Sequence, residues 1–80
     1  MEKAPINILS TRKIDQRDLP LLFQSGGFTY RAVDYGRRGF VPGGFSVVVR
    51  SSSGQVMELM QDDSSQRWYV ARIVQNRTFA

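Results

Sequence analysis

The C-terminal half of the chain constrains the fold most, because two turn-forming tetrapeptides divide a region rich in β-branched and aromatic residues. Such residues favour strands over helices in the runs Phe45–Arg50, Gln55–Gln61 and Arg67–Asn76. The segments SSSG and DDSS between these runs supply the small and acidic residues typical of tight turns. We therefore expect a three-stranded antiparallel meander at the C-terminus.

The last of these strands carries apolar side chains on both of its faces. Its apolar residues alternate between the faces, with Trp68, Val70 and Val74 on one and Tyr69, Ala71 and Ile73 on the other. A strand of this kind is covered on both sides, either in the middle of a sheet or in a small barrel. Trp68 is accordingly predicted to anchor the core rather than to form a binding surface.

Two further strands are predicted in the N-terminal half. The run Ile6–Leu9 is short and β-branched, which suits an edge strand. The run Phe28–Val33 alternates between apolar and polar residues, which is typical of a half-buried strand. Residues 1–5 are polar and end in proline, so they are predicted to form a flexible start.

One short helix is predicted between these strands, from Leu19 to Ser25. Asp18 would cap its N-terminus, Pro20 would lie in the first turn, and Gly26 would follow its last residue. An earlier start would place Pro20 inside the helix, where it removes a hydrogen bond and clashes with the preceding turn. Leu19, Leu22 and Phe23 would then face the core.

These elements predict an α+β, mostly β fold in one domain that spans residues 1–80. Eighty residues can enclose only one hydrophobic core. We expect a small antiparallel sheet or a partly open barrel of four or five strands, with one short helix and the C-terminal meander. An 80-residue domain without disulfides often gains stability by associating with a second copy of itself, so a homodimer is also considered.

The residue types that are missing exclude several kinds of chemistry. The chain has no cysteine, which excludes disulfides, thiolate zinc sites and thiol nucleophiles. It has no histidine, the commonest general base and metal ligand. Asp62 and Asp63 lie in QDDSSQ and are interpreted as turn residues rather than as a catalytic or metal pair. We predict no enzymatic activity, no cofactor and no metal site.

The expected location is the cytoplasm, without contact to a membrane. No apolar run is long enough to span a bilayer, and the first ten residues lack the apolar segment of a signal peptide. The absence of cysteine fits a reducing compartment.

Arginine dominates the positive charge of the chain. The formal net charge is +4, with nine arginines and two lysines, and the calculated pI is about 10.1. A guanidinium group binds phosphate or carboxylate in two places and stacks on flat rings, whereas a lysine ammonium is a well-hydrated point charge. This bias favours nucleic acid or an acidic protein surface as a partner.

The most suggestive stretch is DYGRRGFVPGG, Asp34 to Gly44, which is predicted to be a loop that connects two sheet strands. Its glycines and proline are explained by that connection. Turn formation does not explain the adjacent pair Arg37 and Arg38, which an exposed loop would present to a partner.

Basic and aromatic residues alternate around this stretch and again at the start of the last strand. Proteins that bind single-stranded nucleic acid combine a basic groove with aromatic rings on which bases stack. We predict nucleic-acid binding, in which Arg31, Arg37 and Arg38 contact the sugar–phosphate backbone of the nucleic acid. Tyr35 and Phe40 would stack on its bases. The predicted surface comprises seven residues: Arg31, Tyr35, Arg37, Arg38, Phe40, Arg67 and Arg72.

The alternative is a protein-interaction or regulatory module that uses the same surface. Tyrosine, tryptophan and arginine are the residues most often found at the energetic centres of protein interfaces. A small basic domain of this composition could dock on an acidic partner as an accessory subunit or an inhibitor. The positions of the arginines should discriminate, since a nucleic-acid surface needs them on one face and without acidic partners.

Overall fold

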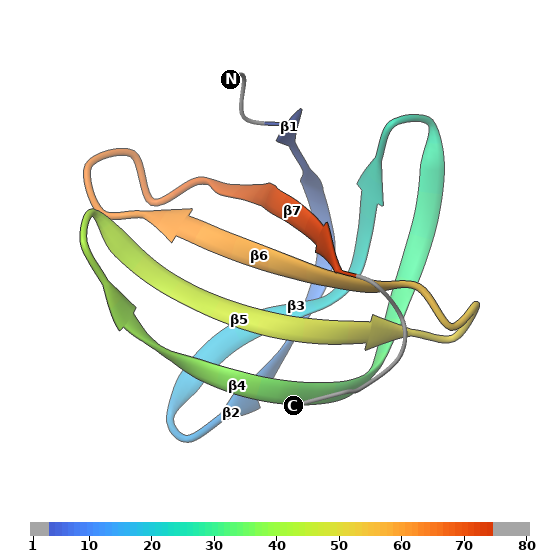
Figure 1. Cartoon of the computed structure of the whole chain (residues 1–80), viewed down its shortest axis with the longest axis horizontal. Coiled ribbons are helices and arrows are strands. Elements are labelled where there is room, and N and C mark those ends of the chain that lie inside the picture. Colours follow the sequence, from blue (N-terminus) through green and yellow to red (C-terminus); the bar gives the residue numbers. More distant parts are fainter. Residues whose placement is uncertain (1–3, 75–80) are drawn as a thin grey trace.

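Antiparallel strands joined by short turns make up the computed structural model, which describes residues 4–74 (Figure 1). No helix occurs within these residues. The strands are β1 (Ala4–Pro5), β2 (Asn7–Ile14), β3 (Arg17–Ser25), β4 (Phe28–Val41), β5 (Gly44–Ser51), β6 (Val56–Asp62) and β7 (Trp68–Val74). The protein is therefore all-β in its described part, so the expected α+β class is wrong, whereas the expectation of a mostly β fold is confirmed.

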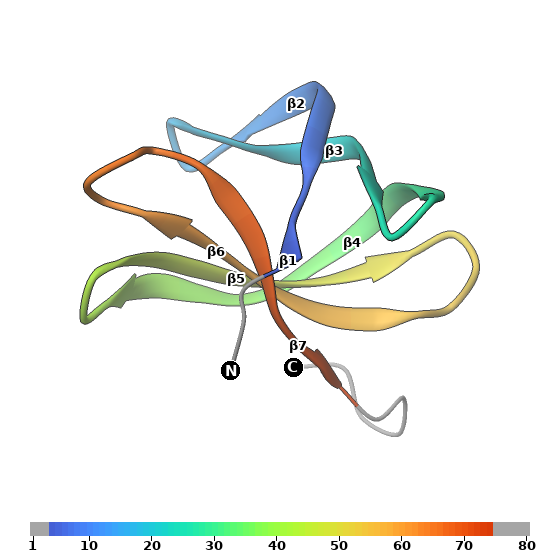
Figure 2. The same cartoon turned by 90° about the horizontal axis from the view of Figure 1, so that it is seen from above.

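The sheet curls until one continuous run of chain lies at both of its edges. The strand order is β1-β7-β6-β5-β4-β3-β2, and only Ile6 separates β1 from β2. If β1 and β2 are counted as one interrupted strand, the described residues form six strands rather than the predicted four or five. β1 meets β7 over only two residue pairs, Ala4 with Val70 and Pro5 with Tyr69. Figure 2 shows β2 and β3 on one side of the interior and β5 and β6 on the other.

The predicted helix from Leu19 to Ser25 is wrong, because this segment lies in strand β3. The residues before it form a two-residue hairpin turn, with Asp15 and Gln16 at φ 53° and 65°. Positive φ at both central residues is the type I′ geometry, which matches the twist of antiparallel strands. The chain therefore reverses before the expected helix start, and Asp18 and Leu19 already pair with β2.

Burial along β3 follows no strict period, because Pro20 is fully buried as well as its neighbour Leu19, and Leu22 is partly buried like Leu21. Leu19 and Phe23 are fully buried, and Leu21 between them is partly buried. Pro20 is tolerated because β3 pairs with β4 only from Leu22 to Ser25. Its missing N–H therefore breaks no hydrogen bond with β4.

The predicted loop from Asp34 to Gly44 is also wrong, because β4 continues through it to Val41. The ladder between β4 and β5 slips twice along this stretch, between Ala32 and Asp34 and between Tyr35 and Arg38. Slips of this kind are β-bulges, which absorb extra residues while the strand continues. Only Pro42 and Gly43 form the actual turn, where Gly43 has φ 89°.

The C-terminal meander is confirmed. β5, β6 and β7 pair in sequence with antiparallel register, and their bounds lie within two residues of the predicted ones over the described chain. The predicted end of the last strand, residues 75–76, lies outside the described residues. The predicted edge strand at Ile6–Leu9 is confirmed from Asn7 onward as the start of the longer β2, while residues 4–5 of the expected flexible start form β1.

The core lies between the β2–β3 hairpin and the concave side of β4 to β7. Leu19 and Phe23 from one side meet Val47, Val49 and Leu59 from the other, all fully buried. Burying one such side chain contributes roughly 1.5–3 kcal/mol to folding. Trp68 is 7% exposed in the same cluster, which confirms its predicted role as a core anchor.

Candidate functional site

Register brings four side chains into a row across β4, β5, β6 and β7 at one end of the sheet. Phe40 pairs with Phe45, Phe45 with Gln61, and Gln61 with Trp68. Phe45 is 7% exposed, whereas Phe40 at the outer end of the row is 78% exposed. The two rings meet edge to face, with their centroids 5.3 Å apart. The row therefore ends in an aromatic ring that is mostly open to solvent.

Arg17 covers this row from the opposite side of the interior. It is the first residue of β3, directly after the two-residue turn. Its guanidinium carbon lies 4.1 Å from the ring centroid of Phe45 and 5.2 Å from that of Phe40. An Nη atom of Arg17 donates a 3.3 Å hydrogen bond to Oε1 of Gln61, whereas the buried Nε has no hydrogen-bond partner. Cation–π contacts thus hold a positive charge against both rings.

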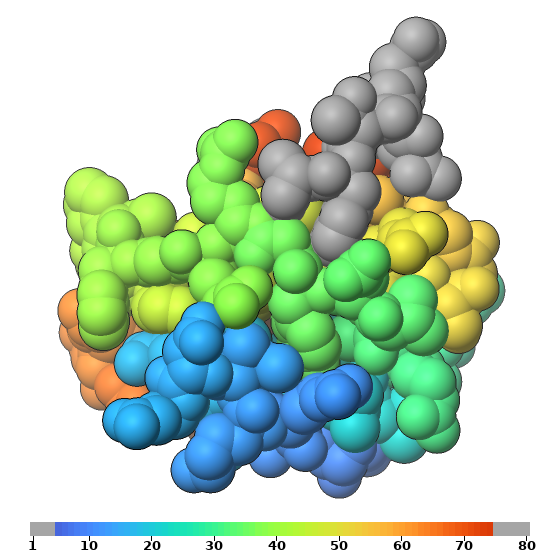
Figure 3. Space-filling view, turned by 90° about the horizontal axis from the view of Figure 1, so that it is seen from below, coloured from blue at the N-terminus to red at the C-terminus, as the bar shows by residue number. Residues whose placement is uncertain are grey.

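A pocket of about 370 Å³ opens between the β2–β3 turn and the start of the β4–β5 hairpin. Its lining combines two arginines, two phenylalanines and polar residues from the turn: Asp15, Gln16, Arg17, Arg38, Phe40 and Phe45. We call it the hairpin pocket. Figure 3 shows the face on which the β2–β3 hairpin, in blue, lies against β4, in green.

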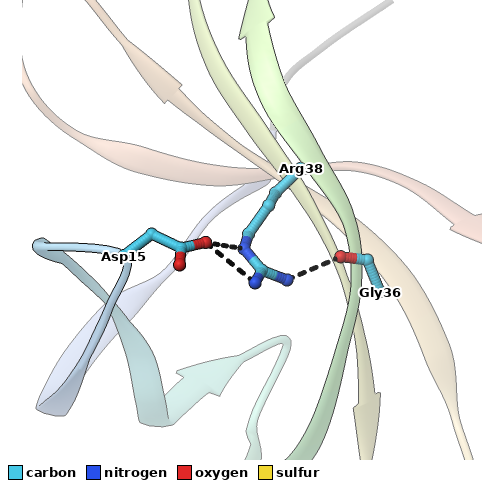
Figure 4. Close-up of polar contacts among 3 residues, drawn as sticks. All are labelled: Asp15, Gly36 and Arg38. Carbon is cyan, nitrogen blue, oxygen red and sulfur yellow. Dashed lines mark hydrogen bonds and ion pairs between the residues drawn. The ribbon is translucent and has the colours of Figure 1, made fainter.

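Arg38 connects the two walls of the hairpin pocket. Its Nε and one Nη donate to the same carboxylate oxygen of Asp15, at 3.0 and 2.9 Å. The other Nη donates to the backbone carbonyl of Gly36 at 3.0 Å. Figure 4 shows the guanidinium held between the turn and the β4 bulge by these contacts. All three of its nitrogens are therefore engaged within the protein.

Two more arginines, Arg37 and Arg12, lie near the middle of β4. Arg37 is exposed and lies in the bulge, where it and Gly36 together oppose Val48 of β5. Arg12 is exposed on β2 and pairs with Leu19 of β3. Burial raises the pKa of Tyr35, and the positive charge of Arg12 opposes this rise. Arg12 therefore lies close to the middle of β4.

The predicted site residues divide into two groups. Arg38 and Phe40 line the hairpin pocket, and Arg37 adjoins them. Tyr35 is half-buried, and its hydroxyl donates to the carbonyl of Pro20 rather than facing solvent.

The remaining predicted arginines lie elsewhere. Arg31 is near the other end of the sheet, opposite Leu22 of β3. Arg67 lines a separate pocket of about 280 Å³ beside Trp68. Arg72 donates to Glu58 at 2.9 Å.

Acidic residues neutralise part of the positive surface. The described chain contains four ion pairs: Lys13–Asp18, Arg38–Asp15, Arg50–Asp34 and Arg72–Glu58. Arg12, Arg31, Arg37 and Arg67 are exposed and form no ion pair with another described residue. Two of the five arginines in the predicted surface, Arg38 and Arg72, are thus paired with acids, and Arg31, Arg67 and Arg72 do not line the hairpin pocket. This arrangement counts against the seven predicted residues as one nucleic-acid surface and restricts the candidate site to the hairpin pocket.

Sequence reasoning missed Arg17, Arg12 and Asp15. The signal for Arg17 was present in IDQR, because two polar residues between apolar-flanked runs can form a type I′ turn. The predicted helix left no second strand after the turn, so the pairing of Ile14 with Arg17 was not expected. Nothing local indicates the contact between Asp15 and Arg38, which are 23 residues apart.

Residues 4–74 contain no group of three or more acidic side chains that could hold a metal ion. No helix in that range is long and apolar enough to cross a membrane. Comparisons of the whole chain with protein-family models, with curated proteins and with solved structures found no match.

Proposed function

We propose that this protein is a non-catalytic domain that binds single-stranded nucleic acid at the hairpin pocket. In this proposal the ring of Phe40 stacks on a base, while Arg37 and Arg12 contact phosphates on either side. The supporting observation is the position of Phe40, a ring 78% exposed that shares a pocket with Arg17 and Arg38.

The surroundings of Phe40 suit stacking. Phe45 and Arg17 hold the ring from within, so that it is fixed before a base arrives. A fixed ring loses little conformational entropy on binding. Stacking of one base on an aromatic side chain contributes roughly 1–3 kcal/mol and tolerates any base, so the expected binding is weakly sequence-dependent.

Charge supports the same proposal. Arg12 and Arg37 are exposed and have no ion pair among the described residues, so their guanidinium groups can contact phosphate without first breaking an internal contact. Each phosphate contact releases counterions and makes the affinity depend on salt.

Fluorescence anisotropy with labelled single-stranded and duplex oligonucleotides tests the proposal. We expect preference for the single strand and affinity that falls steeply between about 50 and 200 mM salt. Phe40→Ala should weaken binding about 5- to 150-fold, the equivalent of one lost stacking contact. Phe28→Ala is the matched control, because Phe28 is 66% exposed but lies beside the β3–β4 turn, outside the hairpin pocket.

Arg37→Ala tests the charge contribution, with Arg31→Ala as a control that removes the same charge from another part of β4. Arg37→Ala should weaken binding and lower the salt slope more than Arg31→Ala does. Affinity weaker than about 100 μM for every oligonucleotide at low salt would contradict the proposal and favour the alternative, an acidic protein partner at the same pocket.

A further inference from the structure

The contact between Arg38 and Asp15 resembles the contact that an arginine makes with phosphate. One carboxylate oxygen accepts from both Nε and Nη of Arg38, at 3.0 and 2.9 Å. The same two adjacent N–H groups of a guanidinium can donate to the oxygens of a phosphate. The carbonyl of Gly36 fixes the third nitrogen, so the donor side of Arg38 already faces into the hairpin pocket.

Asp15 is placed so that it can leave Arg38 at little cost. Its side chain is 74% exposed, while that of Arg38 is 31% exposed. Asp15 belongs to the two-residue turn, and the turn itself is closed by the backbone pairing of Ile14 with Arg17. An ion pair with one partner so exposed contributes little to stability, because water solvates the released carboxylate. The guanidinium of Arg38, in contrast, stays held by Gly36.

We propose that a phosphate of the bound strand replaces the carboxylate of Asp15 on Arg38, so that Asp15 is an internal competitor that limits the affinity of the hairpin pocket. This inference rests on the proposed function and concerns how the affinity of the same pocket is limited. The phosphate on Arg38 is adjacent to the base on Phe40, because both residues line one pocket. Because a ligand must displace Asp15, free anions, which contact only Arg38, should bind weakly. A strand that offers a base to Phe40 and a phosphate to Arg38 together should bind more tightly.

The same hairpin supplies a matched control. Asp18 pairs with Lys13 at 3.6 Å, and both side chains are more than half exposed. Asp18→Asn removes one negative charge from the hairpin without releasing Arg38. Asp15→Asn removes the same charge and weakens the hold on Arg38. Asparagine tolerates the positive φ of 53° at position 15, so the turn is preserved.

The experiment measures the affinity of the wild type, Asp15→Asn, Asp18→Asn, Arg38→Ala and the double variant Asp15→Asn/Arg38→Ala for one labelled single strand at fixed low salt. Asp15→Asn should bind about 2- to 5-fold more tightly than Asp18→Asn, the range expected for loss of one exposed competing ion pair. In the Arg38→Ala background Asp15→Asn should strengthen binding no more than Asp18→Asn does in the wild type, since only the effect of net charge remains there. Thermal unfolding of each variant confirms that it is folded.

The outcomes separate this inference from the proposed function. Equal affinities of Asp15→Asn and Asp18→Asn, in proteins that do bind the strand, would overturn the competitor role and leave the proposed function standing. A gain in the Arg38→Ala background that exceeds the effect of Asp18→Asn would do the same, because it would not act through Arg38. Failure of every variant, including the wild type, to bind the strand would overturn both.

Discussion

The hydroxyl of Tyr35 on β4 donates a 2.7 Å hydrogen bond to the backbone carbonyl of Pro20 on β3. The backbone pairing between these strands ends at Leu22 and Arg31, so the carbonyl of Pro20 receives no backbone hydrogen bond from β4. Pro20 is fully buried, and an unpaired carbonyl there would cost free energy. A side chain thus connects β3 and β4 where they have already separated.

Tyr35→Phe should lower the free energy of unfolding by about 1–2 kcal/mol, because it leaves the carbonyl of Pro20 without its donor. Tyr30→Phe is the control, since the hydroxyl of Tyr30 makes no hydrogen bond with another described residue although its ring stacks on Phe23. Urea unfolding of the two variants measures the difference. Equal effects of the two substitutions would show that the bond to Pro20 contributes nothing.

The same tyrosine should make stability depend on alkaline pH. Burial raises the pKa of Tyr35 above its ordinary value of 10.0. The native state therefore holds this proton more tightly than the unfolded state does, so the contribution is complete below pH 10 and is lost as the pH rises through the raised pKa. The stability advantage of the wild type over Tyr35→Phe should shrink between neutral pH and about pH 10.5 in urea titrations. A difference that stays constant with pH would contradict this expectation.

Close approach of two strands makes Gly44 sensitive to substitution. A Cβ at this position would overlap the backbone carbonyl oxygen of Gln61 on β6, which cannot move without breaking the ladder. Gly44→Ala should therefore cost about 3 kcal/mol or more. Gly39→Ala is the control, because a Cβ there meets nothing within 4 Å and the backbone is not strained. Thermal unfolding compares the two, and similar melting temperatures would refute the argument.

The strands of the C-terminal meander were predictable because local signals agree there. Val47 and Val49 alternate with outward residues on β5, and turn residues flank the strand on both sides. On β3, local signals conflict: Leu19, Leu22 and Phe23 fit a helix, while Leu19, Leu21 and Phe23 fit a strand. Pairing with β2 and β4 decides between them, and a single segment does not contain that information.

The stretch Asp34–Gly44 was misjudged because its glycines resemble turn residues. Gly36 instead lies in a bulge, and Gly39 pairs with Ser46 inside the ladder. The prediction nevertheless named Arg38 and Phe40, which share the hairpin pocket. It could not anticipate that Asp15 engages Arg38 or that Arg17 underlies Phe40, since these contacts arise only when the β2–β3 hairpin folds over β4.

Arg17 offers a test of whether charge or shape matters beneath the exposed ring. Its buried Nε has no partner, and an unsatisfied donor of this kind costs about 1–3 kcal/mol. Arg17→Met keeps most of the side-chain volume over Phe45 while removing that donor, the hydrogen bond to Gln61 and the cation–π contacts. These losses and gains nearly cancel, so its free energy of unfolding should lie within about 1 kcal/mol of the wild type.

Arg17→Ala should be clearly less stable than Arg17→Met, because it also removes the side-chain carbons that cover Phe45. Urea unfolding of the pair separates the two contributions. If Arg17→Met is as destabilised as Arg17→Ala, the positive charge rather than the covering side chain stabilises this end of the sheet. If Arg17→Met is instead about as stable as the wild type, the substitution changes the charge beneath Phe40 without disturbing the fold. Any change in its affinity for a single strand would then measure the contribution of that charge.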